Sequence, residues 1–348
     1  MRRTRGPQRP GQRGGSGRGG PPPLASVITQ ERQTAAEAVP GLAVAAPRRS
    51  RGSPLRAPYW LMAPSLALLA IVVFVPMAAA FYISLTGLNE YSIGDWLHAP
   101  FVGLKHYVDT LSPGAAFASS LFDSVKASLA FSILTTLAIT PIGVGAALLL
   151  NGPMRGRAVF RGLMLLPYVI PTFVNAVLWR LVFMNGTGVA DQLLAALHLG
   201  SRETFWLIGP RSLWALVIAD VWAAWPFIYI MTLAALQTIP AELYDAAAID
   251  GARGLRVFQH VTLPLIRGTL GLALVLSTIN HFNNFTLPFV MFGISPPAQV
   301  NVLPLNIYVN SFITFNFGLG AAMSVVALFI MLTPAVIYLR AARVGDSD

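Results

Sequence analysis

The chain has 348 residues, of which 55% are hydrophobic and only 11% are charged. Such a composition offers too little polar surface to cover a water-soluble globule, so it excludes an ordinary soluble domain and predicts an integral membrane protein. The absence of cysteine excludes disulfides, iron–sulfur clusters and thiolate zinc sites, and five scattered histidines give no metal-ligand spacing.

The formal net charge of +10 is concentrated at one end of the chain. Residues 1–56 hold eleven of the 24 Lys and Arg residues but only two of the 14 acids, which leaves residues 57–348 nearly neutral. This stretch is rich in Arg, Gly and Pro and cannot bury enough apolar surface to fold. We predict a disordered basic cytoplasmic tail beside lipid headgroups, with no nucleic-acid partner. A regulatory or RNA-contacting tail and an artefactual upstream start codon stay open as alternatives.

Six apolar stretches are long enough to cross a hydrocarbon core of roughly 30 Å as helices. They predict an all-α integral membrane domain with six transmembrane helices over residues 57–343, followed by a C-terminal tail at 344–348. Membrane helices tolerate proline, so we expect kinks and not helix boundaries at the prolines inside these stretches. The stretches are 60–84, 124–150, 160–184, 213–236, 265–289 and 318–339, and the prolines are Pro76, Pro141, Pro167, Pro171, Pro226, Pro288 and Pro334.

The distribution of cations predicts the orientation in the membrane. Arg155, Arg157 and Arg161 stand without an acid between the second and third stretches, whereas the loop before the second stretch carries four acids and one lysine. The positive-inside rule therefore places both termini in the cytoplasm of a multi-pass protein of the bacterial plasma membrane. By parity, the loop at 240–264 is cytoplasmic as well.

This loop predicts two short helices joined by a turn. Pro240 and the acids Glu242 and Asp245 suit a helix start, where they face unpaired amides and the positive end of the helix dipole. Alanines follow, Gly251 permits a left-handed turn, and Phe258 is expected to stand out as an apolar docking knob.

The same loop resembles the coupling loop of ATP-binding-cassette (ABC) importer permeases. That pattern has Glu-Ala-Ala, three residues, Gly, nine residues, Ile, one residue and Leu-Pro; here Asp245 replaces Glu and Val261 replaces Ile, and every spacing is kept. The shorter Asp245 side chain puts one salt bridge to the ATPase in question. The resemblance implies the type I ABC importer permease fold, in which these residues are coupling helices that contact a separate ATPase: Glu242, Asp245, Ala246, Ala247, Asp250, Gly251, Ala252, Phe258 and Pro264.

Further motifs are similar to sugar permeases of the maltose permease type, over roughly residues 57–343. They include residues 102–107, 160–167, 282–285 and 317–323, whereas residues 294–297 depart from the usual Gly-Gly-Pro turn. The resemblance implies a second related permease in a heterodimer, two ATPase subunits and an extracytoplasmic sugar-binding protein. ATP and Mg would bind on the ATPases, since this chain has no Walker-type glycine loop and is expected to bind no cofactor and to be no enzyme.

The fifth stretch carries Ser277, Asn280, His281 and Asn284, whose spacing places them on one face of a helix. Polar groups inside a membrane need partners or a wet cavity, so the row predicts either contacts with sugar hydroxyls or hydrogen bonds that hold helices together. The maltose permease resemblance favours substrate contact for this row.

Two neighbouring stretches carry aromatic and polar faces. In the fourth, Ala224, Phe227 and Trp222 are predicted to line the substrate path, because aromatic rings stack on sugar rings, although lipid-facing packing is the alternative. Asp220 lies in the same stretch. As an isolated acid it supports proton coupling only weakly, and the alternative is that it lies at the extracellular mouth of the pathway. In the third, the favoured interpretation is an interface with a second permease and the alternative is a second cavity wall: Tyr168, Thr172, Asn175 and Trp179.

The sequence thus predicts a permease subunit that forms half of a sugar pathway and works by ATP-driven alternating access. An ion-coupled secondary transporter is the main alternative; it predicts paired intramembrane charges or inverted repeats, which the sequence does not display. A membrane enzyme is a third possibility, but it would need a cluster of catalytic residues, and the sequence does not display one.

Overall fold

A computed structural model describes residues 57–112, 114, 117–198 and 204–345. The predicted tail at 1–56 and the last three residues lie outside these ranges. The chain divides into two units, residues 1–66 and 67–348. The first contributes only the start of helix α2 to the described residues, and the account below concerns the second.

Five helical segments in the described ranges are long and apolar enough to cross a membrane. The first is not a regular α-helix throughout, because a π-helical turn, η1, precedes Pro76. The fifth predicted stretch is interrupted before its end. The helices concerned are α2 (Ala57–Leu69), η1 (Ala70–Phe74), α3 (Val75–Ser84), α5 (Ala118–Asn151), α10 (Ser212–Leu236), α13 (Leu263–Phe282), α14 (Thr286–Phe292) and α16 (Phe317–Gly345).

The third predicted stretch is broken, and here the expectation of kinks without boundaries is wrong. Helices α6 (Arg157–Leu163) and α7 (Leu166–Val169) meet α8 (Thr172–Val182) at an angle of 83°. Pro167 lies in the first turn of α7 and Pro171 caps α8, so each proline starts a helix. The described residues therefore hold five spans, or six if this bent pair crosses the membrane as one.

Helix α5 packs along α10, and a glycine allows the close approach. A Cβ atom on Gly143 of α5 would lie 2.7 Å from the Cβ atom of Ile228 and 2.8 Å from the backbone nitrogen of Tyr229, both on α10. Pro141 and Pro226 lie inside these two helices without ending them. This contact fixes where α10 stands, and α10 carries part of the candidate site.

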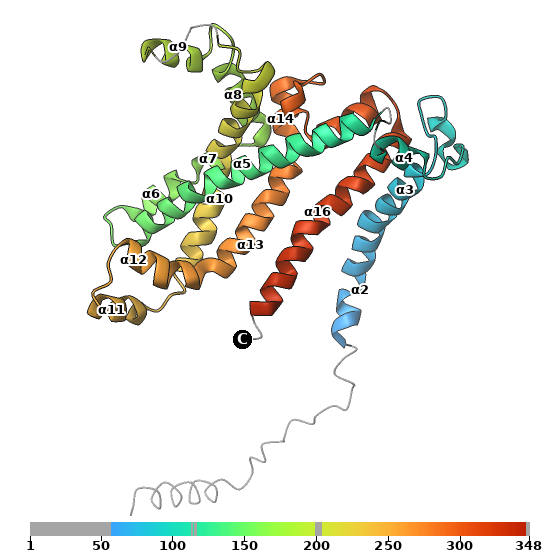
Figure 1. The fold of residues 1–348 in the computed structure, drawn as a ribbon. Coiled ribbons are helices and arrows are strands. Elements are labelled where there is room, and N and C mark those ends of the chain that lie inside the picture. The colour runs from blue at the N-terminus through green and yellow to red at the C-terminus, as the bar shows by residue number, and fades with distance from the viewer. Residues whose placement is uncertain (1–56, 113, 115–116, 199–203, 346–348) are drawn as a thin grey trace, which may run out of the picture. The chain divides into compact units, whose positions relative to one another are not determined.

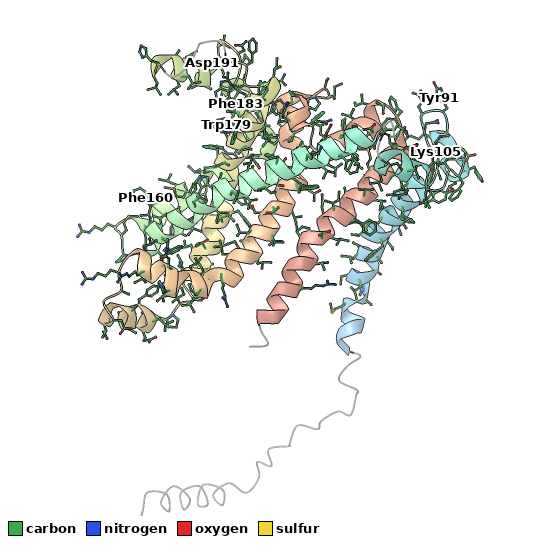
Figure 2. All side chains as sticks on the ribbon, viewed as in Figure 1. Tyr91, Lys105, Phe160, Trp179, Phe183 and Asp191 are labelled. Atoms are coloured by element: carbon green, nitrogen blue, oxygen red, sulfur yellow. The ribbon has the colours of Figure 1, made fainter. Side chains whose placement is uncertain are left out.

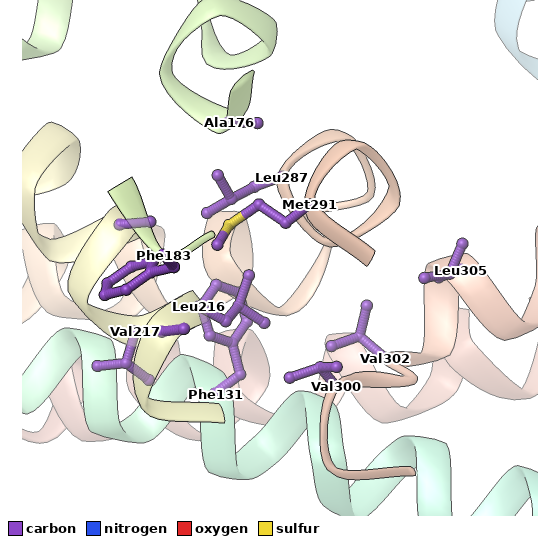
Figure 3. Close-up of a cluster of buried hydrophobic side chains, with 12 residues drawn as sticks. Phe131, Ala176, Phe183, Leu216, Val217, Leu287, Met291, Val300, Val302 and Leu305 are labelled. Atoms are coloured by element: carbon purple, nitrogen blue, oxygen red, sulfur yellow. The ribbon is translucent and has the colours of Figure 1, made fainter. Parts of the chain in front are cut away.

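A buried apolar cluster joins α5, α8, α10 and α14. Figure 3 shows Phe131 of α5, Leu216 of α10 and Leu287 and Met291 of α14 meeting in it. Burial of large side chains is the main favourable term that holds such elements together. The cluster ties α14 to α10 beside the break that follows α13.

Several short helices outside the spans were not predicted from the sequence. Figure 2 labels Lys105 in α4 (Lys105–Leu111) and Asp191 in α9 (Val189–Ala196). Asp191 is fully buried and accepts hydrogen bonds from the backbone amides of Gly186 and Thr204 and from Trp206 Nε1. These bonds fold the connection between α8 and α10 onto itself.

The loop after the fifth stretch is also structured, although the sequence showed only its lack of charge. It forms η5 (Ala298–Val300), α15 (Leu303–Tyr308) and the π-helical η6 (Val309–Ile313). Asn306 Nδ2 donates to Ser120 O and Ser124 Oγ at 3.1 and 3.0 Å, and Leu303 N donates to Ser128 Oγ at 2.7 Å. Polar groups of α5 thus hold this segment in place.

The two ends of the helices differ in character. Figure 1 shows α11 (Ala241–Ile249) and α12 (Leu255–Val257) toward the same end as the C-terminus of α16, whereas α4 and α9 lie toward the other. Helix α6, which follows α5 and contains Arg157 and Arg161, lies toward the α11 end (Figure 1). The cation-rich loops and the 240–264 segment therefore share one end.

Candidate functional site

A polar cavity of about 460 Å³ lies between α7, α8, α10 and α13. This volume falls within the range of about 300–1,000 Å³ that is typical of small-molecule sites. The broken third stretch supplies one wall, and the break after α13 supplies another. The lining residues are Tyr168, Ile170, Thr172, Asn175, Asp220, Ala223, Ala224, Asn280, His281, Asn283, Asn284, Phe285 and Thr286.

The break after α13 turns two asparagines toward the cavity. Helix α13 ends at Phe282, and α14 begins at Thr286. Asn284 Oδ1 accepts the backbone amide of Leu287 at 3.2 Å, as a capping side chain does, and Asn284 Nδ2 donates to Asp220 Oδ1 at 3.4 Å. Asn284 therefore links the start of α14 to α10.

Asp220 of α10 and His281 of α13 form a buried carboxyl–imidazole pair at the cavity wall. Their exposed side-chain fractions are 9% and 7%, and His281 Nδ1 lies 2.6 Å from Asp220 Oδ2. This is ion-pair distance, although the ring N–H is poorly aligned for a hydrogen bond to that oxygen. The other ring nitrogen, Nε2, lies 3.0 Å from Ser277 Oγ.

Asn175 of α8 adds an acceptor without a partner. Its Nδ2 donates to the carbonyl of Ala219 at 3.1 Å, while its Oδ1 is buried and forms no hydrogen bond in the part of the chain that the structure describes. A buried oxygen without a donor costs about 1–3 kcal/mol.

The segment between α10 and α13 is a compact helical unit. Helix α11 ends in a left-handed residue, Gly251, with φ +77°. Ala252 N donates to Ala247 O at 2.9 Å and Gly251 N donates to Ala248 O at 3.1 Å, which is the paired capping pattern of a Schellman motif. The glycine thus stops α11 and turns the chain toward α12.

This unit is joined to α13 through the π-helical η4 (Phe258–Thr262). Tyr244 Oη lies 3.4 Å from Thr262 Oγ1, and Ala247 is buried. Phe258 packs inward against the cluster that contains Ile139 and Ile228, so it is not the outward knob that the sequence suggested. The exposed apolar side chains of the unit include Ile249 and Leu255.

Residues 139–345 match the family described as binding-protein-dependent transport system inner membrane component. That match spans more than half of the chain. The chain belongs to this family. It is therefore a multi-pass membrane component of an ABC importer, and it is a transport subunit and not an enzyme.

Similar curated proteins match this permease over most of their length. The trehalose/maltose transport system permease protein MalF of Thermococcus litoralis is 32% identical over 82% of this chain and 93% of its own. The sulfoquinovosyl glycerol transport system permease protein SmoG of Agrobacterium fabrum is 30% identical over 82% and 90%. A solved bacterial transporter that imports the acidic polysaccharide alginate has the same fold, with a TM-score of 0.68, 21% identity and coverage of 82% and 94%.

The permease brings together only part of the residues predicted to bind substrate. Asn280, His281, Asn284 and Ala224 line the cavity, and Ser277 reaches it through His281. Tyr168, Thr172 and Asn175 also line it, which is the arrangement of the second-wall alternative. Their contact with a second permease stays a prediction.

Two predicted aromatic contacts lie away from the lining. Phe227 stacks on Tyr168 with ring centroids 6.5 Å apart, and Trp222 packs against Trp179 at 6.2 Å. Both rings therefore support lining or wall residues, and their contact with substrate stays a prediction. Sequence reasoning noted Asp220 but missed its partner, because residues 220 and 281 come from helices that are distant along the chain.

The residues predicted to couple to the ATPase lie together. Glu242, Asp245, Ala246, Asp250 and Gly251 are exposed on α11 and its cap. Pro264 stands in the first turn of α13, and Ala252 follows the cap. An ATPase contact by any of them stays a prediction.

Proposed function

We propose that this permease forms half of the translocation pathway for a sugar that an extracytoplasmic binding protein delivers. One observation carries the proposal: α10 and α13, which hold Asp220 and His281 at the cavity, are the two helices that flank the 240–264 segment. A force on that segment acts on both cavity walls. The relatives named for trehalose, maltose and sulfoquinovosyl glycerol support a sugar as the cargo.

The remaining half of the pathway is assigned to a second, related permease in a heterodimer. Two ATPase subunits bind ATP and Mg and dock on the exposed side of α11, so the termini and the 240–264 segment are cytoplasmic. The shared end of α11, α12 and the arginine-rich loop after α5 supports this orientation (Figure 1).

Closure of the ATPases pushes α11, and the chain that follows its capped C-terminus passes the displacement through α12 and η4 to α13. The bundle then rocks between outward-open and inward-open states. Sugar hydroxyls exchange hydrogen bonds with the amides and hydroxyls that line the cavity.

The Asp220–His281 pair brings two ionisable side chains together between α10 and α13, which is close to the paired intramembrane charges that the ion-coupled alternative predicts and that the sequence did not display. Family membership nevertheless supports an ATP-driven importer over that alternative. The pair needs a role within the importer.

Reconstitution tests the proposal. The permease is placed in vesicles with its partner permease, ATPase and binding protein, and uptake of radiolabelled sugars is measured. We expect uptake that requires both ATP and the binding protein and that persists when ion gradients are collapsed. Uptake driven by a proton or sodium gradient without ATP would contradict it.

A further inference from the structure

The fold alone does not fix whether the cargo is charged, since a solved transporter with the same fold imports an acidic polysaccharide. The side chains that line the cavity must set any preference for charge. Among the residues that line it, Asp220 is the one carboxylic acid, His281 is the one imidazole, and there is no Lys or Arg. The lining therefore offers an anionic cargo no cationic side chain other than this imidazole.

The imidazole cannot serve as a cation for an anionic cargo. Nδ1 faces the Asp220 carboxylate at 2.6 Å, and Nε2 faces Ser277 Oγ at 3.0 Å. Both ring nitrogens are thus engaged within the protein, and any positive charge on the ring is balanced by the carboxylate beside it.

The carboxylate of Asp220 is an acceptor that the protein leaves weakly satisfied. Asp220 Oδ1 accepts only a long bond of 3.4 Å from Asn284, and Asp220 Oδ2 is buried and accepts no hydrogen bond from the described residues. Hydroxyl groups supply such donors, whereas carboxylate, sulfonate and phosphate groups are acceptors and would meet a partly desolvated negative charge.

We propose that the Asp220–His281 pair is a charge-selective element that makes this half of the pathway accept uncharged, hydroxyl-rich sugars and repel anionic ones. This rests on the proposed function, because it names the class of cargo for the same cavity. Asp220 sets the charge, and His281 holds the carboxylate in position while withholding its own N–H groups from the cargo.

The absence of cysteine from the natural chain allows a test that needs no sugar. Asn280→Cys places the chain's single thiol at the cavity wall, and the assembled transporter is treated with hydroxyethyl or sulfonatoethyl methanethiosulfonate. Mass spectrometry of this subunit gives the two modification rates. Their ratio cancels the thiol's own reactivity and reports the local repulsion of an anion.

With Asp220 present, we expect the anionic reagent to be slowed, relative to the neutral one, by about tenfold against the same ratio in Asn280→Cys/Asp220→Asn. Asp123→Asn is the matched control, because it removes an exposed carboxylate on α5 and should leave the ratio unchanged. Equal ratios with and without Asp220 would overturn the proposal.

If the Asp220→Asn variant does not assemble, the Asn280→Cys ratio is compared with that of Ser295→Cys on an exposed loop, with Asp220 kept in both. Equal ratios at the two positions would again overturn the proposal, and a lower anionic rate at position 280 supports it. Failure of ATP-dependent sugar uptake would instead count against the proposed function and leave these rates intact.

Discussion

The 240–264 segment and the cavity beside Asp220 are connected through α10 and α13, but their residues are distributed differently along the sequence. The segment is a run of consecutive residues, and its cap, formed by Ala247, Ala248, Gly251 and Ala252, is local along the chain. The cavity takes its walls from α7, α8, α10, α13 and the break before α14. A local element survives changes elsewhere in the chain, whereas a composite one depends on every helix that positions it.

The largest expected effect comes from breaking the local element. Gly251→Pro should abolish ATP-coupled uptake, because proline fixes φ near −65° and Gly251 requires +77°. The variant should still insert in the membrane, which fractionation shows. Gly251→Asn is the control, since asparagine tolerates positive φ, and it should retain measurable uptake. Normal uptake by the proline variant would remove the coupling role from this segment.

The composite element is broken through the contact that positions α10. Gly143→Ala puts a methyl group 2.7 Å from the Cβ atom of Ile228, and overpacking of this kind costs about 1–3 kcal/mol. The thermal midpoint of the solubilised transporter should fall. Gly145→Ala on the same helix meets no atom within 4 Å and should leave the midpoint in place. Equal midpoints for the two variants would mean that α5 and α10 are not packed so closely.

A smaller effect is expected at the link between α14 and α10. Asn284→Ala removes the acceptor for Leu287 N and the donor to Asp220 Oδ1. Sugar uptake should fall roughly three- to tenfold, which matches the net loss of about one or two hydrogen bonds. Copurification with the ATPase should be unchanged, because the 240–264 segment is untouched. An uptake rate and cargo profile equal to the wild type would count against the polar face of α13.

The smallest effect is expected at the contact between Tyr244 of α11 and Thr262, just before α13. Tyr244→Phe deletes the 3.4 Å contact with Thr262 Oγ1, which is long for a bond between hydroxyls. ATP-driven uptake should change by less than about twofold, because so long a bond contributes little. A loss of tenfold or more would show that the phenol hydroxyl itself transmits the displacement.

The sequence was most informative where residues near in the chain act together. The spacing from Asp245 to Pro264 predicted the coupling resemblance, and the family match confirms the class of protein. Spacing also placed Asn280 and His281 on one helical face, and both line the cavity. The outward orientation expected for Phe258 was wrong because exposure depends on what lies opposite, and here the half-buried ring packs against the cluster that contains Ile139 and Ile228.

The prolines also show what the sequence alone cannot predict, namely whether a helix bends or ends. Pro141 and Pro226 lie inside continuous helices, whereas Pro167 and Pro171 bound the 83° break. The residue is the same, and it removes the same backbone donor each time. Whether a helix bends or ends depends on which neighbours satisfy the freed carbonyls, and those neighbours are not nearby in sequence.

The sequence by itself determined that this chain is an apolar helical membrane protein whose 240–264 segment resembles a coupling loop, since hydropathy and local spacing depend only on residue order. The tertiary structure decided the cavity and which side chains meet in it. Asp220 and His281 stand 61 positions apart and are brought to 2.6 Å only because α10 and α13 pack together. An ion pair across two helices has no periodicity along the chain, so no pattern in the sequence announces it.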